Sequence, residues 1–367
     1  MSRLPELGQL SAAATRGRVK RILIVRLSAI GDVVMASGLI PALRALHPDA
    51  HLAWLVEPAA APLLAHNPRL DELIIWPRAE WQALWRARHY LALWRQFTEF
   101  RRLLRASQFD LVLDTQGLLK SALWSWLSGA PRRISLLGRE GSHRLATERV
   151  IPPAPEGLRP MGAEYRHLAR HLGAPEGSFQ PDLVVGAAPR KRAREHLASA
   201  GLTAPGTPYA LLCPFTTRPQ KHWFEDRWQA LARRCIEAGL APALLGGPDD
   251  VEAASRIAAG VPRLVNLAGA LKLDEAVAAI EGASLLIGVD TGLTHMGSAL
   301  GVPTIALFGS TKPYDDPVAP LSVVLYEKLV CSPCRRHPIC QGRFDCMRAL
   351  EVDHVFDTAC GLLALRR

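Results

Sequence analysis

The sequence predicts an α/β protein of two domains, each built on a parallel β-sheet. Its 367 residues suggest two domains, because a typical domain has about 150 residues. Short apolar segments that begin at Arg21 and Tyr209 each run into a polar loop and then a helix, which is typical of the start of a doubly wound sheet. With 49% hydrophobic and 21% charged residues, the composition is that of a globular protein and excludes disordered and fibrous classes.

The first half is expected to contain strands and helices in alternation. Its first helix should kink at Pro41, because proline has no N–H to donate within a helix. A second helix is expected in a segment rich in tryptophan and arginine. The predicted strands are residues 22–25, 51–56 and 111–114, and the predicted helices are residues 33–46 and about 80–106.

The second half repeats the alternation more regularly, so a parallel sheet covered on both faces is expected. Residues 152–155 and 175–189 are rich in turn residues, and we place the domain junction near residues 175–190. The predicted strands are residues 209–213, 243–245, 264–267, 284–289 and 304–308, and the predicted helices are residues 225–238, 249–259, 273–281 and 294–300.

Positive charge is concentrated in one part of the chain. The net charge is +10, and residues 76–150 hold 13 Lys and Arg against 6 Asp and Glu, with six of the nine tryptophans. This pattern indicates either an anionic interface or a basic, solvated face over buried aromatic anchors. Because no nucleic-acid-binding module accompanies the charge, nucleic acid is not an expected partner.

No segment is expected to direct export or to span a membrane. Residues 1–18 hold only three consecutive alanines, short of the roughly 7–15 apolar residues of a signal peptide. No run approaches the roughly 18 apolar residues that cross a bilayer. We therefore expect a cytoplasmic protein that could still bind a membrane surface, with its seven cysteines kept as thiols or metal ligands.

Three loops that follow predicted strands carry candidate functional residues. In residues 288–295, Asp290 ends a strand, and the small pair Thr291 and Gly292 opens a helix whose free amides can bind phosphate. Asp290 could accept hydrogen bonds from sugar hydroxyls, and His295 lies within reach of the same ligand. The alternative is a capped helix with a hydrogen-bonded histidine that has no ligand.

The other two loops suit a diphosphate and a proton acceptor. Thr216, Thr217 and Lys221 follow the strand at 209–213 and offer two hydroxyls and one ammonium, although a solvated connection would look the same. Asp32 lies at the first turn of a helix, where it favours the helix dipole and could also take a proton from an acceptor hydroxyl. The sequence has no Asp-x-Asp pair, so no catalytic metal is expected.

Four of the seven cysteines lie within sixteen residues and could form a structural metal site. Four thiolates at this spacing suit zinc or iron in a reducing compartment, and unligated thiols are the alternative. Such a site would be structural because four thiolates leave no open coordination position. The candidate ligands are Cys331, Cys334, Cys340 and Cys346.

Four motifs together resemble the bacterial ADP-heptose:lipopolysaccharide heptosyltransferases of glycosyltransferase family 9. They are residues 26–33 (RLSAIGDV), 116–122 (QGLLKSA), 216–223 (TTRPQKHW) and 290–295 (DTGLTH), in the same order as in the family. The resemblance implies the GT-B fold, in which two Rossmann-like domains face each other and a C-terminal helix crosses back. It also implies inverting transfer of L-glycero-D-manno-heptose from ADP-heptose to Kdo-lipid A.

The resemblance further implies a role for each matching residue. Asp32 would be the general base. The donor would be bound by Thr216, Thr217, Lys221, Asp250, Leu271, Asp290, Thr291, Gly292 and His295. The acceptor would be bound by Lys120, Arg139, Arg78, Arg86 and Arg88, at the inner leaflet of the membrane.

The same resemblance implies a domain plan and leaves the acceptor open. Expected are an extension (residues 1–18), an acceptor domain (19–182), an ADP-sugar domain (183–345) and a helix packing back on the N-terminal domain (346–367). The cysteine loop is absent from the pattern of members that act on Kdo-lipid A, whereas members that modify proteins include some with an iron-holding loop. A protein or a later core sugar is therefore the alternative acceptor, and a non-catalytic scaffold that binds nucleotide sugars is the third hypothesis.

Overall fold

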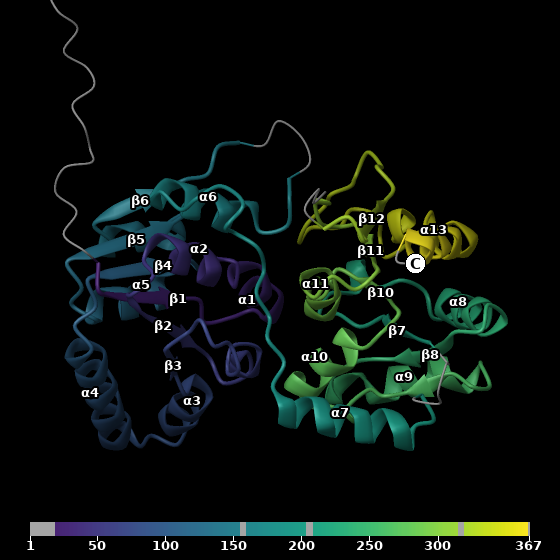
Figure 1. Cartoon of the computed structure of the whole chain (residues 1–367), viewed down its shortest axis with the longest axis horizontal. Helices are drawn as coiled ribbons and strands as arrows, with labels where there is room; N and C mark the ends of the chain where they lie inside the picture. Colours follow the sequence, from purple (N-terminus) through teal and green to yellow (C-terminus); the bar gives the residue numbers. More distant parts are fainter. Residues whose placement is uncertain (1–18, 155–158, 203–207, 315–318, 366–367) are drawn as a thin grey trace, which may run out of the picture.

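The computed structural model describes residues 19–154, 159–202, 208–314 and 319–365, so the predicted extension at residues 1–18 lies outside the described residues. Two six-stranded parallel sheets lie side by side, each covered by helices (Figure 1). The first sheet has the order β3 (Glu72–Ile75), β2 (His51–Val56), β1 (Arg21–Val25), β4 (Leu111–Asp114), β5 (Arg132–Leu136) and β6 (Glu148–Val150).

The second sheet has the same strand order as the first when each is numbered within its own half. Its order is β12 (Ser322–Tyr326), β11 (Thr304–Phe308), β10 (Leu285–Val289), β7 (Tyr209–Cys213), β8 (Ala241–Leu244) and β9 (Val265–Asn266). The central strands β7, β10 and β11 are buried along their whole length, as expected for a parallel sheet covered on both faces. The α/β class predicted from the sequence is confirmed.

The first predicted helix is broken, but not where we expected. It consists of α1 (Ile30–Ala36) and α2 (Leu39–Leu46), so the break falls at Gly38 and the predicted kink at Pro41 is wrong. Pro41 lies in the first turn of α2, where a missing N–H costs no hydrogen bond. A side chain at Gly38 would lie 2.7 Å from the ring of Phe179, so the close approach of another segment explains the glycine.

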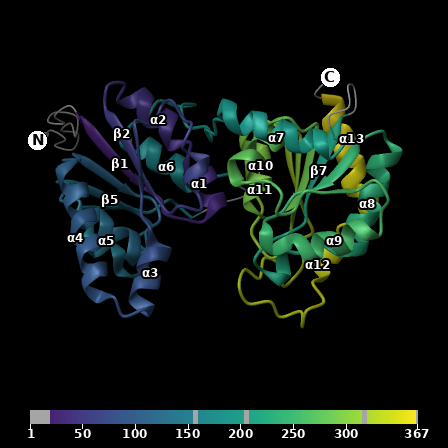
Figure 2. The ribbon, with the colours of Figure 1, turned by 90° about the horizontal axis from the view of Figure 1, so that it is seen from below.

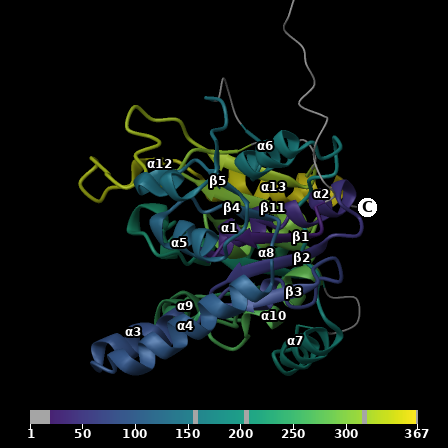
Figure 3. The ribbon, with the colours of Figure 1, turned by 90° about the vertical axis from the view of Figure 1, so that its left-hand side faces the viewer.

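The helix rich in tryptophan and arginine is a hairpin of two helices, α3 (Arg78–Arg86) and α4 (Tyr90–Ala106). Arg88 makes the turn with a left-handed φ of 60°. The hairpin extends away from the N-terminal sheet (Figure 3). No described helix is long and apolar enough to cross a membrane.

The remaining helices cover the two sheets. The longer ones are α5 (Leu119–Leu127), α6 (Ala163–Leu172), α7 (Ala187–Ser199), α8 (Glu225–Glu237), α9 (Val251–Ala259), α10 (Leu273–Glu281), α11 (Gly292–Ala299) and α13 (Val352–Leu365). The short ones are η1 (Ala61–Leu63), η2 (Arg139–Leu145), η3 (Pro219–Lys221), η4 (Pro248–Asp250) and α12 (Asp345–Arg348).

The chain passes from the first sheet to the second through residues 173–186. Helix α6 before this segment packs on α2, and α7 after it packs on α10. Asp182 anchors the segment to the first half, because its backbone N–H donates to Ser37 Oγ at 2.7 Å and its Oδ2 accepts from Asn67 Nδ2 at 2.8 Å. The domain boundaries at residues 182 and 345 remain predictions.

The last helix, α13, does not pack back on the N-terminal domain, so that expectation is wrong. It lies against α8 and β11 of the second half, on the side away from the first sheet (Figure 2). Arg234 of α8 pairs with Asp353 at 2.9 Å and lies over the ring of Phe356. The core of the second half therefore covers the buried face of the helix, which is formed by Val355, Phe356, Ala359 and Leu362.

The two halves meet closely where α1 contacts α11 (Figure 1). A Cβ atom on Gly31 would lie 2.8 Å from Cδ2 of His295, and one on Gly292 would lie 2.7 Å from Cγ2 of Ile30. A single apolar cluster includes buried residues of both halves. The loop after β1 is therefore held directly against the loop after β10.

Candidate active site

A buried cluster of charged side chains lies at the end of β10. Asp290 follows the last residue of that strand, and its Oδ2 lies 2.5 Å from Nζ of Lys221, which ends η3. Its Oδ1 lies 3.3 Å from Nε2 of His295 in the second turn of α11. The side chains of Lys221 and Asp290 are only 15% and 12% exposed, so water screens the pair weakly.

The pKa of Asp290 is set by competing effects. Burial alone would raise this pKa, but the hydrogen bond and charge of His295 and the charge of Lys221 hold it well below its ordinary value. Because the pKa of Asp290 is lower in the folded state than in the unfolded state, the ionised carboxylate stabilises the fold above about pH 4. This stabilisation is lost as the pH falls further. The Asp290 carboxylate is therefore ionised at neutral pH.

Two members of this cluster were not predicted from the sequence. Thr311 Oγ1 donates to Asp290 Oδ2 at 2.6 Å, and the hydroxyl of Tyr314 lies 3.2 Å from Nδ1 of His295. Both follow β11, the neighbour of β10 in the sheet. They are expected to fix the carboxylate and the imidazole in place.

The other donor-side residues surround the cluster at the same sheet edge. Thr216 is half-buried and its carbonyl oxygen lies 2.8 Å from Nε2 of His222, whereas Thr217 is exposed. Thr291 is the residue before α11 in an extended conformation, and Gly292 is the first residue of the helix. The N-terminus of α11, whose free amides can bind a phosphate, thus lies beside Asp290.

Asp250 and Leu271 lie further along the same edge. Asp250 Oδ2 accepts the backbone N–H of Gly247 at 2.8 Å, so one carboxylate oxygen already stabilises the loop after β8. Leu271 is half-buried and packs against the apolar cluster that joins the halves. Their expected contacts with ribose and adenine remain predictions.

Asp32 lies in the first half, on the helix that contacts α11. Its carboxylate is 38% exposed and pairs with the guanidinium of Arg26, which is itself buried. Arg26 Nη1 also donates to the carbonyl oxygen of Thr115 at 3.0 Å. Arg26 therefore orients Asp32 from a fixed position, a role that the sequence analysis did not assign to it.

Lys120 and Arg78 come together through a glutamate that was not predicted. Lys120 Nζ donates to Glu57 Oε1 at 3.0 Å and to Ser28 Oγ at 3.3 Å. Arg78 Nη1 lies 3.5 Å from the same Glu57 oxygen. Since Ser28 precedes α1, the basic pair lies on the same loop edge as Asp32.

The other predicted basic residues lie around this pair at different distances. Arg139 is exposed, and its backbone N–H donates to Gly117 at 2.8 Å, so it borders the loop that leads to Lys120. Arg86 ends α3, about 12 Å along the helix from Arg78. Arg88 lies beyond it in the turn, so the structure does not bring Arg88 to Lys120.

The loop before Lys120 is capped by a buried carboxylate. Asp114 ends β4, and its Oδ1 accepts the N–H groups of Gln116 and Gly117 at 3.2 and 3.0 Å. Its Oδ2 is buried with no hydrogen-bond partner among the described residues. Burial raises the pKa of Asp114 to about 6.

We expect Asp114→Asn to stabilise the protein at pH 8 and to have little effect near pH 4. A folded-state pKa above the unfolded value means that the folded state loses stability as the pH rises from about 4 to about 6. The asparagine removes this loss, which amounts to about 3 kcal/mol at most. Urea unfolding at both pH values measures the difference, with exposed Glu99→Gln as the control. A variant that is no more stable at pH 8 contradicts the prediction.

The structure does not support a structural metal at the cysteine loop. Within the described residues, no group of three or more His, Cys, Asp or Glu side chains is arranged to hold a metal ion. Cys346 is buried, whereas Cys331, Cys334 and Cys340 are partly exposed. Burial raises the pKa of Cys334 and Cys346, and the neighbouring thiols raise it further.

The two facing sheets, with a carboxylate on one half and a Lys–Asp–His cluster on the other, fit the arrangement of GT-B glycosyltransferases. The model of glycosyltransferase family 9 (heptosyltransferase) matches residues 97–342. Lipopolysaccharide heptosyltransferase 1 of Pseudomonas aeruginosa is 32% identical over 333 residues, which is 86% of each chain. The chain belongs to glycosyltransferase family 9.

Solved structures show the same fold. The family 9 glycosyltransferase of Veillonella parvula superposes with a TM-score of 0.78 at 22% identity, covering 94% of this chain and 97% of that one. The ADP-heptose heptosyltransferase II of E. coli superposes with a TM-score of 0.75 at 23% identity, covering 94% and 99%. The two-domain GT-B fold implied by the resemblance is thereby confirmed, whereas α13 packs on the second half and does not cross back.

Proposed function

We propose that the protein transfers L-glycero-D-manno-heptose from ADP-heptose to Kdo-lipid A during synthesis of the lipopolysaccharide core. The relative from Pseudomonas aeruginosa is named for heptose transfer to lipopolysaccharide. The observation that carries the proposal is the contact between α1 and α11, because it brings the helix of Asp32 against the helix of His295. The proposed proton acceptor and the proposed donor site would thus meet at one junction.

The donor half would bind the nucleotide and stabilise it as it leaves. Negative charge grows on the diphosphate while its bond to the anomeric carbon breaks, and ADP departs with that electron pair. The ammonium of Lys221 and the free amides at Thr291 and Gly292 would face this charge. Thr216 and Thr217 would orient the phosphates, and Asp290 and His295 would contact heptose hydroxyls.

The acceptor half would supply the base. The acceptor hydroxyl oxygen attacks the anomeric carbon from the face opposite the leaving group, and its proton passes to the Asp32 carboxylate. One displacement inverts the anomeric centre and forms no covalent bond to the enzyme. Because Lys221 and the helix amides supply the positive charge, the proposal assigns no step to a metal ion.

The basic residues would hold the acceptor at the inner face of the membrane. Lys120, Arg78, Arg86 and Arg139 suit the Kdo carboxylate and the lipid A phosphates. The excess of positive charge over residues 76–150 also suits an anionic leaflet. The proposal therefore places the enzyme in the cytoplasm, peripherally on the inner membrane.

One assay tests donor and acceptor together. ADP or UDP release is measured with ADP-heptose or UDP-glucose as donor and with Kdo-lipid A, a heptose-bearing core or a protein as acceptor. Turnover is expected only for ADP-heptose with Kdo-lipid A. Its rate should not change when EDTA is added, and the anomeric configuration of the product should be inverted. Faster turnover on either other acceptor would replace the acceptor in the proposal, and equal use of UDP-glucose would contradict the donor.

A further inference from the structure

The α3–α4 hairpin carries an open apolar groove of about 690 Å³ outside the site described above. Trp85 and Trp94 are each 62% exposed, which is far more than such large apolar side chains normally show. Exposed apolar patches of this kind usually mark a binding surface. The lining consists of Trp81, Trp85, Tyr90, Leu93, Trp94 and Phe97.

The floor of this groove has a fixed shape. Trp81 is buried and packs edge-on against Trp124 of α5, with ring centroids 5.6 Å apart. It also contacts Phe97 and Phe100 of α4, at 6.2 and 5.8 Å. The groove is therefore a preformed feature of the hairpin, since its inner rings are locked by their neighbours.

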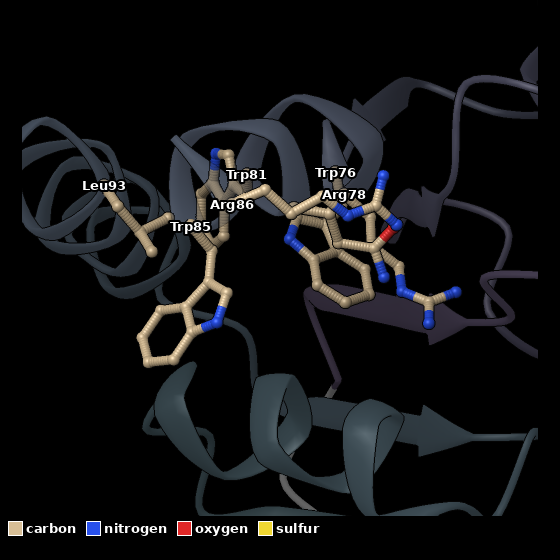
Figure 4. Close-up of a pocket in the computed structure, with 7 residues that line it drawn as sticks. Trp76, Arg78, Trp81, Trp85, Arg86 and Leu93 are labelled. Atoms are coloured by element: carbon tan, nitrogen blue, oxygen red, sulfur yellow. The ribbon is translucent and has the colours of Figure 1, made fainter. Parts of the chain in front are cut away.

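A second, more polar cavity of about 400 Å³ adjoins the groove and leads to the acceptor side. The two share Trp81, Trp85 and Leu93 as lining residues. The second cavity adds Trp76 and the two basic residues Arg78 and Arg86, all on or just before α3 (Figure 4).

Arg78 connects this cavity to the candidate active site. It contacts Glu57, which accepts from Lys120, and Lys120 in turn donates to Ser28 beside α1. A chain of polar contacts therefore links the loop before the helix of Asp32 to Arg78, which lines the cavity beside the aromatic groove. From Asp32 to the groove, the side chains change from a proton acceptor to anion-binding groups and then to apolar rings.

We propose that the groove binds an acyl chain of the lipid acceptor while Arg78 and Arg86 bind the phosphate from which that chain extends. This inference rests on the proposed function and deepens it. The order of these side chains matches a phosphorylated, acylated sugar, with the saccharide at Asp32. Apart from one phenol oxygen, the groove side chains offer no hydrogen-bond acceptor, so a peptide would bury unpaired backbone N–H groups there, whereas a hydrocarbon chain would not.

The test compares two acceptors that share one saccharide, one acylated and one with all acyl chains removed. Both are assayed in nonionic detergent micelles, so no bilayer is present. The variant is Trp85→Ala with Trp94→Ala, and the matched control is Trp126→Ala, an exposed tryptophan of α5 that does not line the groove.

The wild type should show a lower KM for the acylated acceptor. The double variant should raise that KM on the order of tenfold or more while kcat stays near the wild-type value, and it should use the deacylated acceptor as the wild type does. The control should keep the preference for the acylated acceptor. An unchanged preference in the double variant, or an equal loss on both acceptors, would overturn the inference.

Binding without turnover separates this inference from the proposed function. A phosphorylated glucosamine with a dibrominated acyl chain should quench the tryptophan fluorescence of the wild type, and the double variant should lose most of this quenching. Quenching without heptose transfer would refute the proposed heptosyltransferase function but support acyl-chain binding in the groove. The wild type and the double variant should sediment equally with anionic vesicles that lack acceptor. If the double variant no longer binds these vesicles, the groove binds the bilayer and not an acyl chain of the acceptor, and the inference is overturned.

Discussion

Replacing Asp32 with asparagine is expected to lower kcat by about 10²–10⁴-fold, the usual contribution of a general base. The amide keeps the size of the carboxylate but cannot accept the proton of the attacking hydroxyl. ADP binding should stay within about twofold, because the donor cluster around Lys221 lies in the other half. Coupled ADP release measures the rate, and calorimetric titration measures ADP binding.

The control for this substitution is Glu164→Gln, which neutralises another carboxylate in the first turn of a helix in the same half. It should leave kcat unchanged. An Asp32→Asn enzyme with a normal rate would remove Asp32 from the mechanism. Simultaneous loss of ADP binding would instead indicate that Asp32 maintains the contact between α1 and α11.

Replacing Lys221 with glutamine is expected to lower kcat/KM for ADP-heptose by about 10²–10³-fold. This is the usual loss when one hydrogen-bonding group that faces a developing anion is removed. The variant loses the ammonium that would face the diphosphate. It also leaves the Asp290 carboxylate, 12% exposed, without the charge that lies 2.5 Å away, so this anion would repel the incoming phosphates. Steady-state kinetics with varied ADP-heptose give the measurement.

Two further variants define the cause of this loss. Lys221→Arg retains the positive charge and should recover part of the activity, although its guanidinium has a different shape. Lys328→Gln removes an exposed lysine from the same half and should have no effect. If the glutamine and arginine variants lose activity equally, the position of the ammonium matters more than its charge.

The strand-end loops could be predicted from the sequence, but their partners from other loops could not. Asp290, Lys221 and His295 lie in recognisable motifs, and the structure brings them together. Thr311 and Glu57 contact Asp290 and Lys120 from segments without a motif. Such contacts depend on which loops become neighbours in space, and a single sequence does not encode this in any local pattern.

The same limit applies to the fold. Alternating strands and helices indicated parallel sheets, because burial on both faces leaves a clear apolar pattern. The break at Gly38 and the turn at Arg88 depend on contacts and on a left-handed φ that have no periodic signal. The predicted position of α13 was carried over from the resemblance and was wrong. The apolar face of an amphipathic helix could not correct it, because such a face does not specify which surface will cover it.

The position of α13 has a consequence for recombination within the family. Among the described residues, the backbone passes between the sheets only through residues 173–186, and the last helix stays with the half that precedes it. A chimera that takes its acceptor half from one homologue and its nucleotide half from another therefore needs a single splice. Its parents must still match at Gly31 and Gly292, where the halves leave no room for a side chain.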